Sequence, residues 1–198
     1  MSRPRATILL YPGCIFLEIA AAAEILAEHC ELGYFTPIGE VHEASNGLRI
    51  MATGSYADAA ERAAACVVVP GGNPDSIIEP GSASECLRAA HRGGAVMAGI
   101  CAGALVLARA GLLRGRRATH SYTAEHATAE VVACTAPIFE GIRFERADVV
   151  VDPPFITAQY WAAGKFAAAI AEAIGVFSAK DVAAYLHRYG RSYDRPQA

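Results

Sequence analysis

The sequence predicts an α/β fold, a three-layer sandwich in which helices cover both faces of a mostly parallel sheet. Short apolar runs rich in β-branched residues alternate with longer helical patterns, which is typical of βαβ units. Several of these runs, such as the one at 66–69, are continuously apolar, as expected for strands that are buried on both faces. The runs end in Pro-Gly or Gly-x-Cys, where glycine and proline mark sharp turns.

The first hundred residues contain patterns for four strands, one hairpin and two helices. Residues 16–30 carry apolar side chains at helical spacing, with glutamates spread around them. The segment 42–56 predicts a hairpin with Asn46-Gly47 at its turn. A second helix is predicted over 82–94, where serines cap the start and glycines mark the end. The predicted strands are, in chain order, 5–13, 33–40, 64–72 and 95–100.

The second half of the chain begins with a helix pattern at 101–111 and then becomes looser. Short strands are suggested at 116–122, 131–139 and 142–152. Segment 155–175 ends in a long helix, and a final helix is predicted over 178–190. Because no linker, repeat or low-complexity tract interrupts the pattern, we expect one domain over residues 1–198 with a flavodoxin-like arrangement.

The composition is that of a globular protein: 54% of the residues are hydrophobic and 19% are charged. The net charge is −3, and no basic block interleaved with aromatic residues suggests a nucleic-acid surface. The apolar run near the N-terminus is too short for a signal peptide or a membrane span. We therefore expect a cytoplasmic protein without nucleic-acid or membrane partners. Its six cysteines should be mostly thiols, and since they form no Cys-x-x-Cys pair, we expect no metal site.

The segment Gly99-Ile100-Cys101-Ala102-Gly103 lies where a strand pattern gives way to a helix pattern. It fits the Gly-x-nucleophile-x-Gly elbow, in which a sharp strand-to-helix turn strains the backbone of the nucleophile. The positive end of the following helix is expected to lower the pKa of the Cys101 thiol and favour the thiolate. The alternative is a buried cysteine in an Ala/Gly-rich packing site.

A Gly-Gly loop follows the neighbouring strand, and parallel strands bring such ends to the same edge of the sheet. Backbone N–H groups of this loop and of the elbow could bind a developing oxyanion, and Gly72 and Ala102 are the predicted donors. The alternative for Gly71-Gly72 is an ordinary tight turn.

Two residues are candidate acid or base partners for the thiolate. Glu18 begins an otherwise apolar helix, and a carboxyl group in an apolar pocket has a raised pKa and can donate a proton near neutral pH. His120 follows the elbow helix and could form a Cys–His pair with Cys101. The alternatives are a glutamate stabilised by the helix dipole and a surface or core histidine.

At these residues the chain resembles the ThiJ/PfpI superfamily, within the class I glutamine-amidotransferase-like folds. The similarity covers nearly the whole chain, and its specific part is the elbow with the segment that follows it. The segments that carry it are ILLYPGCIFLEIAAAAEIL (8–26), VVVPGGN (67–73), GICAGALVLARAGLLRGRRATH (99–120) and DVVVDPPFITAQYWAAGKFAAAIAEAIG (148–175).

The resemblance implies roles for five residues. Cys101 would be the nucleophile, Glu18 a protonated acid hydrogen-bonded to its sulfur, and Gly72 and Ala102 the oxyanion site. His120 would lie nearby. The resemblance also implies a protein without cofactors that forms a homodimer.

The chain departs from the family pattern at three places. Ala102 stands where the protease-like branch has histidine, which argues against a peptidase. The late turn reads AQYWAAGK, so Tyr160 and Trp161 are expected to line the substrate pocket; the alternative is hydrophobic anchoring at a helix start. Cys14 precedes Glu18 and would be a second pocket thiol or, as we favour, a small apolar residue. Tyr122 and His126 are expected to help determine the size of the pocket.

These residues suit attack on a small electrophilic carbon followed by proton return. We therefore expect a cofactor-independent, Cys101-dependent hydratase or lyase that hydrates isonitriles or converts α-oxoaldehydes, with Glu18 as proton donor. The main alternative is a non-enzymatic oxidative-stress sensor or chaperone that acts through oxidation of Cys101. An amidase-type hydrolase is a further alternative. A ligand-binding module of a transcription regulator is less favoured, since no DNA-binding segment follows residue 198 in this sequence.

Overall fold

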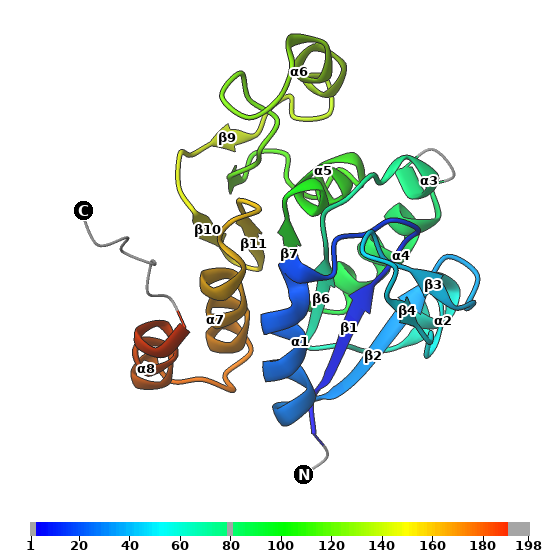
Figure 1. Ribbon diagram of the computed structural model, residues 1–198, viewed down its shortest axis with the longest axis vertical. Helices are drawn as coiled ribbons and strands as arrows, with labels where there is room; N and C mark the ends of the chain where they lie inside the picture. Colours follow the sequence, from blue (N-terminus) through cyan, green and yellow to red (C-terminus); the bar gives the residue numbers. More distant parts are fainter. Residues whose placement is uncertain (1–2, 79–80, 190–198) are drawn as a thin grey trace.

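A seven-stranded sheet forms the middle layer of the computed structural model, which describes residues 3–78 and 81–189 (Figure 1). Neighbouring strands run parallel, except that the edge strand β10 is antiparallel to β11. The strands are, in spatial order, β10 (Val149–Asp152), β11 (Phe155–Ala158), β7 (Val96–Ile100), β6 (Cys66–Val69), β1 (Arg5–Leu9), β2 (Glu31–Thr36) and β5 (Gly54–Ser55). The predicted α/β class with a mostly parallel sheet is confirmed.

Helices cover both faces of this sheet (Figure 1). On one side, α1 (Leu17–His29) packs against α7 (Ala163–Ala173), and α7 packs against α8 (Ala179–Tyr189). The other side is formed by α2 (Tyr56–Glu61), α3 (Asp75–Ile78), α4 (Ser82–Arg92) and α5 (Ala102–Arg109), with α4 in contact with the other three. The three-layer sandwich is therefore confirmed, and the predicted end of the last helix at Gly190 lies outside the described residues.

The continuous apolar runs form the central strands because these strands have a helix layer on each face. All residues of β6 and β11 are buried, as are four of the five in β1 and in β7. Phe155 of β11 and Phe166 of α7 are among the largest fully buried side chains of one continuous core. Burying such a side chain contributes roughly 1.5–3 kcal/mol to folding. The carboxyl edge of the sheet therefore rests on a well-packed core.

The predicted hairpin is confirmed over part of its range. Strands β3 (His42–Glu43) and β4 (Arg49–Ile50) pair antiparallel. At the turn, Gly47 has a φ of 83°, and the Leu48 N–H donates to Asn46 Oδ1 at 3.1 Å. The end of the predicted segment instead supplies β5, which pairs parallel with β2.

The valines of the segment 131–139 predict a strand, and this prediction is wrong. The segment begins within α6 (Ala129–Thr135), whose N-cap Thr128 accepts a hydrogen bond from the Val131 N–H. No residue of α6 is buried, so these valines have no sheet to join, and the cap decides the local structure. The flanking short strands are confirmed as β8 (Arg117–Ala118) and β9 (Arg143–Phe144), which pair with each other.

The helix predicted over 82–94 is confirmed as α4, but the serine cap is wrong. Gly81 is the N-cap residue, with a φ of 77°, and no side chain caps the helix. A left-handed backbone conformation at this position favours glycine over serine. No helix in residues 3–78 and 81–189 has both the length and the apolar character needed to cross a membrane.

Candidate active site

Cys101 lies between the end of β7 and the start of α5, at the carboxyl edge of the sheet. Its φ of 55° and ψ of −122° make it the one non-glycine residue with positive φ among the described residues. The Cys101 N–H donates to the Ala158 carbonyl at 2.9 Å, so the neighbouring strand holds this backbone in place. Strained backbone of this kind persists only where surrounding structure enforces it, and it clusters at functional sites.

The two glycines of the elbow are required by close packing of backbone. A Cβ on Gly99 would lie 2.7 Å from the carbonyl of Gly103. A Cβ on Gly103 would lie 2.1 Å from the carbonyl oxygen of Val69 at the end of β6. These contacts leave no room for a larger residue, so the Gly-x-Cys-x-Gly spacing is explained by the fit of α5 against two strands.

The structure brings the predicted acid and the predicted thiol together. The Glu18 carboxyl and the Cys101 thiol share a hydrogen bond. The Gly71 N–H donates to Glu18 Oε2 at 2.8 Å and fixes this carboxyl. A Cβ on Gly71 would lie 2.3 Å from that oxygen and 2.9 Å from the Cys101 sulfur, so the loop must be glycine here.

The two predicted oxyanion donors also converge on the sulfur. The backbone N–H groups of Gly72 and Ala102 donate to Cys101 Sγ, and both lower the pKa of the thiol. Gly72 has a φ of 126°, and a Cβ there would lie 2.6 Å from the Gly13 carbonyl oxygen. The Gly-Gly loop is therefore part of the site and is more than a tight turn.

Burial raises the pKa of Glu18 to about 7, against the lowering effect of its hydrogen bonds to Gly71 and Cys101. The carboxyl group can therefore hold or release a proton near neutral pH, as predicted.

The expected lowering of the Cys101 pKa is wrong. Burial first, and then the negative charge of Glu18, raise the pKa of Cys101 to about 12, and the donors at Ala102 and Gly72 offset only part of this. Desolvation of the sulfur raises its pKa by more than the positive end of the short helix α5 lowers it. When Glu18 is protonated its repulsion disappears and its O–H can donate to the sulfur, so the reactive form of the pair carries one proton and one negative charge.

His120 is buried among aromatic rings. Its imidazole stacks on Phe139 at a centroid distance of 3.8 Å and lies 4.8 Å from the Phe144 ring. Burial lowers the pKa of His120 to about 4, and its Nδ1 accepts the Tyr122 N–H at 3.2 Å. The groups that shift the pKa of Cys101 are Glu18 and backbone amides, and His120 is not among them. The expected Cys–His pair is therefore replaced by a neutral histidine in a packing role.

A cavity of about 410 Å³ adjoins this site, and Gly72 contributes to its wall. Tyr122 also lines it: its pKa is raised by burial and then by the charges of Cys101 and Asp75. Several other lining residues come from α6 and its start, among them Glu130 and Cys134. These residues were not predicted, because the valines at 131–139 favour a strand.

Cys14 is fully buried near the same carboxyl, since burial and the Glu18 charge both raise the pKa of its thiol. Neither Cys14 nor Cys101 is among the residues that line the cavity, so the role of Cys14 as a pocket thiol or a small apolar residue stays a prediction. Tyr11 was missed: its hydroxyl donates to the Pro70 carbonyl at 2.8 Å, and its pKa is raised by burial and by the charges of Cys14 and Cys101. Its place at the end of the first strand was the available signal.

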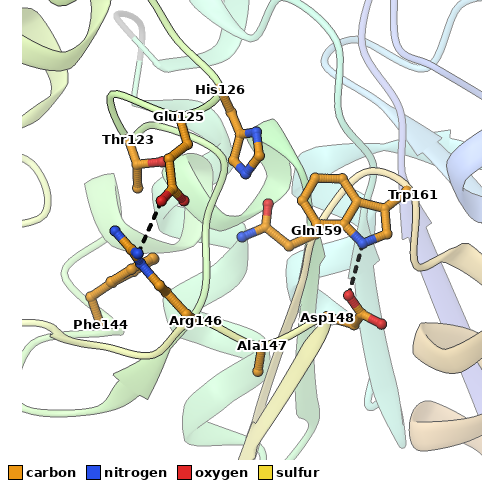
Figure 2. Close-up of a pocket in the computed structure, with 9 residues that line it drawn as sticks. All are labelled: Thr123, Glu125, His126, Phe144, Arg146, Ala147, Asp148, Gln159 and Trp161. Atoms are coloured by element: carbon orange, nitrogen blue, oxygen red, sulfur yellow. Dashed lines mark hydrogen bonds and ion pairs between the residues drawn. The ribbon is translucent and has the colours of Figure 1, made fainter.

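Tyr160 and Trp161 do not line the cavity beside Cys101, contrary to expectation. Trp161 lines a separate cavity of about 220 Å³ together with His126, whose ring lies 5.0 Å from the indole (Figure 2). The Trp161 Nε1–H donates to Asp148 at 2.8 Å, and this bond fixes the indole in the wall of this second cavity. Tyr160 packs edge-on against Trp161 and is half-exposed.

Gln159, which the sequence did not single out, lines the cavity of Trp161 and holds the segment 119–121. Its amide donates to Thr119 Oγ1 at 2.8 Å and to the His120 carbonyl at 3.1 Å, and its oxygen accepts from Ser121 at 2.6 Å. Gln159 follows β11 directly and is buried, so it fixes the loop that carries Tyr122. Within residues 3–78 and 81–189, no group of three His, Cys, Asp or Glu side chains is placed to hold a metal ion.

The fold and the site define an α/β protein with a cysteine at a strand-to-helix elbow and a buried carboxyl against its sulfur. The family model described as the DJ-1/PfpI family matches residues 4–173. The chain belongs to the DJ-1/PfpI family, which includes hydratases, proteases and stress sensors.

Individual relatives agree with this assignment. A Streptomyces lividans protein described as an uncharacterized protein in the cpoL 5′ region is 36% identical over 126 residues, which cover 58% of this chain and 85% of the relative. The crystal structure of Drosophila melanogaster DJ-1beta matches with a TM-score of 0.78 and 25% identity, over 98% of this chain and 100% of that chain. An oxidized DJ-1 from Toxoplasma gondii matches in fold, with a TM-score of 0.77 and 18% identity, over 96% and 100% of the two chains.

Proposed function

We propose that this protein is a cofactor-independent, cysteine-dependent hydratase or lyase that acts on a small electrophilic carbon. One observation carries the proposal: Cys101 shares a hydrogen bond with a buried Glu18 whose pKa is about 7, while the Gly72 and Ala102 N–H groups converge on the same sulfur. This arrangement supplies a nucleophile, a proton donor and an oxyanion site at one point, beside a cavity that admits a small molecule.

Hydration of an isonitrile needs these groups in a simple order. The Cys101 sulfur attacks the terminal isonitrile carbon, and the proton of Glu18 is transferred to that carbon, which gives a thioimidate. Water then adds to the thioimidate carbon, and the carbon–sulfur bond breaks. The product is an N-substituted formamide, and one proton from the water returns to the Cys101–Glu18 pair. The net change is addition of one water molecule, with no oxidant or reductant.

Conversion of an α-oxoaldehyde uses the same groups. The Cys101 sulfur adds to the aldehyde carbon, and the oxyanion that develops accepts hydrogen bonds from Gly72 and Ala102. The Glu18 proton is transferred to this oxygen, which gives a neutral hemithioacetal. Glu18, now ionised, removes the proton from the hemithioacetal carbon and returns it to the adjacent carbonyl carbon, while the hydroxyl proton moves to the former carbonyl oxygen, which gives a 2-hydroxy thioester. Water hydrolyses the thioester to a 2-hydroxy acid and restores the thiol. This reaction is also redox-neutral, because one carbon is oxidised while its neighbour is reduced.

The test is an assay of purified wild-type protein against alkyl and aryl isonitriles, methylglyoxal, glyoxal and simple amides. We expect the wild-type protein to turn over either the isonitriles or the α-oxoaldehydes, and we expect Cys101→Ser to lose this activity. Cys30→Ser is the matched control, because Cys30 follows the C-terminal end of α1 and is not among the residues that line the cavity. Glu18→Gln should lower kcat by about 10²–10⁴-fold, the usual contribution of a positioned acid or base. No turnover of any compound by wild type would contradict the proposal.

The second candidate is an oxidation sensor. Cys101 is partly accessible while four other cysteines are buried, and a structural relative was crystallised in an oxidized form. A sulfinate on Cys101 could accept hydrogen bonds from Gly72, Ala102 and protonated Glu18. Mild hydroperoxide would then add two oxygens to Cys101, detectable by mass spectrometry, in a protein without turnover.

A further inference from the structure

The cavity beside Cys101 carries acidic side chains from two different elements. Asp75 comes from α3, and Glu130 comes from the first turn of α6. The residues that line this cavity, all within the described part of the chain, include these two carboxylates and no lysine, arginine or histidine. A ligand that approaches Cys101 through the cavity therefore meets negative charge.

Two observations place this charge within range of the reacting sulfur. Gly72 lines the cavity and donates its N–H to Cys101 Sγ, so one residue of the cavity wall is in direct contact with the nucleophile. The Tyr122 hydroxyl, also on the cavity wall, feels the charges of Cys101, Asp75 and Glu18, and all of them raise its pKa. None of the described residues that line the cavity is a lysine, arginine or histidine, and the Cys101–Glu18 pair next to Gly72 adds one more negative charge.

We propose that this cavity selects uncharged and cationic electrophiles over anionic ones, and that Asp75 and Glu130 determine this selection. Like charges lower the local concentration of an anion in a cleft, whereas a cation is concentrated there. Leu105 and Val131 supply apolar wall, so the substrate is a small molecule with an apolar substituent and without a carboxylate or phosphate group. This inference rests on the proposed function only where it calls the selected electrophile a substrate, because the charge selection applies to any electrophile that reaches Cys101.

The test uses two thiol reagents that differ in charge. A methanethiosulfonate with a trimethylammonium group and one with a sulfonate group both react with a cysteine sulfur, form a disulfide with it and release methanesulfinate. The ratio of their second-order rates at Cys101 is measured by mass spectrometry at low ionic strength, in a Cys134→Ser background that removes the exposed cavity thiol. The ratio cancels changes in the reactivity of the sulfur itself, since both reagents attack the same atom.

We expect the cationic reagent to react faster, and 0.5 M salt to reduce the ratio because it screens exposed charges. Asp75→Asn with Glu130→Gln should lower the ratio about tenfold, and each change alone about threefold, from Coulomb interactions at distances on the order of 10 Å in a water-like medium. The matched control is Glu61→Gln with Glu172→Gln. These residues are exposed, and Glu172 borders a groove at the start of β7, the end of the strand opposite Cys101.

A ratio that is unchanged in the cavity variant, or lowered equally in the control variant, overturns the inference. These results are separate from the outcome for the proposed function. A protein without turnover that still shows the cavity-dependent ratio retains the charge selection and lacks the proposed activity. If turnover is found, cationic and carboxylate-bearing members of the same substrate class should differ in kcat/KM in the same direction, and the cavity variant should reduce that difference.

Discussion

Replacing Glu18 with glutamine should make the folded protein more stable at alkaline pH. The wild-type carboxyl has a pKa of about 7 in the folded protein, against 4.5 for an unperturbed glutamate. Between these values the folded state binds more protons at Glu18 than the unfolded state does. The contribution of Glu18 to the free energy of unfolding is therefore fully present below pH 4.5 and is lost as the pH rises through 7. At roughly 1.4 kcal/mol per pH unit, the loss amounts to about 3 kcal/mol above pH 8.

Glutamine avoids this loss and keeps the local hydrogen bonds. Its side-chain oxygen can accept the Gly71 N–H, which lies 2.8 Å from the present carboxylate oxygen, and its NH₂ group can donate to Cys101. The variant therefore resembles the protonated form of wild type at every pH. We expect the difference in free energy of unfolding to be near zero at pH 4.5 and about 3 kcal/mol in favour of Glu18→Gln at pH 8.

The assay is urea unfolding of both proteins from pH 4.5 to 8 at constant ionic strength. Groups common to both proteins, such as His120, cancel in the difference. A difference that stays flat across this range would refute the reasoning, because it would mean that Glu18 ionises in the folded state as easily as in the unfolded chain. A variant that is less stable at pH 8 would refute it as well.

Two further predictions concern the backbone fit and the buried histidine. Gly103→Ala should destabilise the protein by at least about 1–3 kcal/mol, because its Cβ would lie 2.1 Å from the Val69 carbonyl oxygen. The control is Gly164→Ala in α7, where the Cβ would meet open space, so stability should change by less than about 1 kcal/mol or increase. Thermal unfolding compares the two variants. Equal effects would contradict the packing argument. His120 has a folded pKa of about 4 against 6.5, so its contribution to stability should rise by up to about 3 kcal/mol from pH 4 to 6.5; in urea unfolding, the difference between wild type and His120→Gln, in which Glu18 cancels, should grow by that amount in favour of wild type. The same slope in both proteins would show that the stacked imidazole on Phe139 titrates normally.

The sequence alone determined the fold class and the centre of the candidate site. Continuous apolar strands specify a sheet covered on both faces, because a strand exposed on one face would alternate with polar residues. The Gly-x-Cys-x-Gly spacing located the elbow, since only glycine fits where α5 meets the ends of β6 and β7. Glu18 was identifiable because a charged residue at the start of an apolar helix must find a buried partner.

Only the tertiary structure decided how these groups are tuned and what surrounds them. The pKa of Cys101 depends on the balance of burial, Glu18 and two backbone donors, and such distances cannot be obtained from spacing along the chain. His120 packs against Phe139, and Trp161 turns to Asp148, because contacts across more than ten residues decide their orientation.

The wall of the cavity shows most clearly the difference between what the sequence determined and what only the tertiary structure decided. Valines in the segment 131–139 indicated a strand from local propensity, but propensity is weak when a segment has no neighbouring strand to pair with. The Thr128 cap and the position of α6 over the site turned these residues into a helix that brings Glu130 and Cys134 to the cavity. Residue types were readable from the sequence, whereas the charge that an approaching substrate meets depends on which distant elements share one cavity.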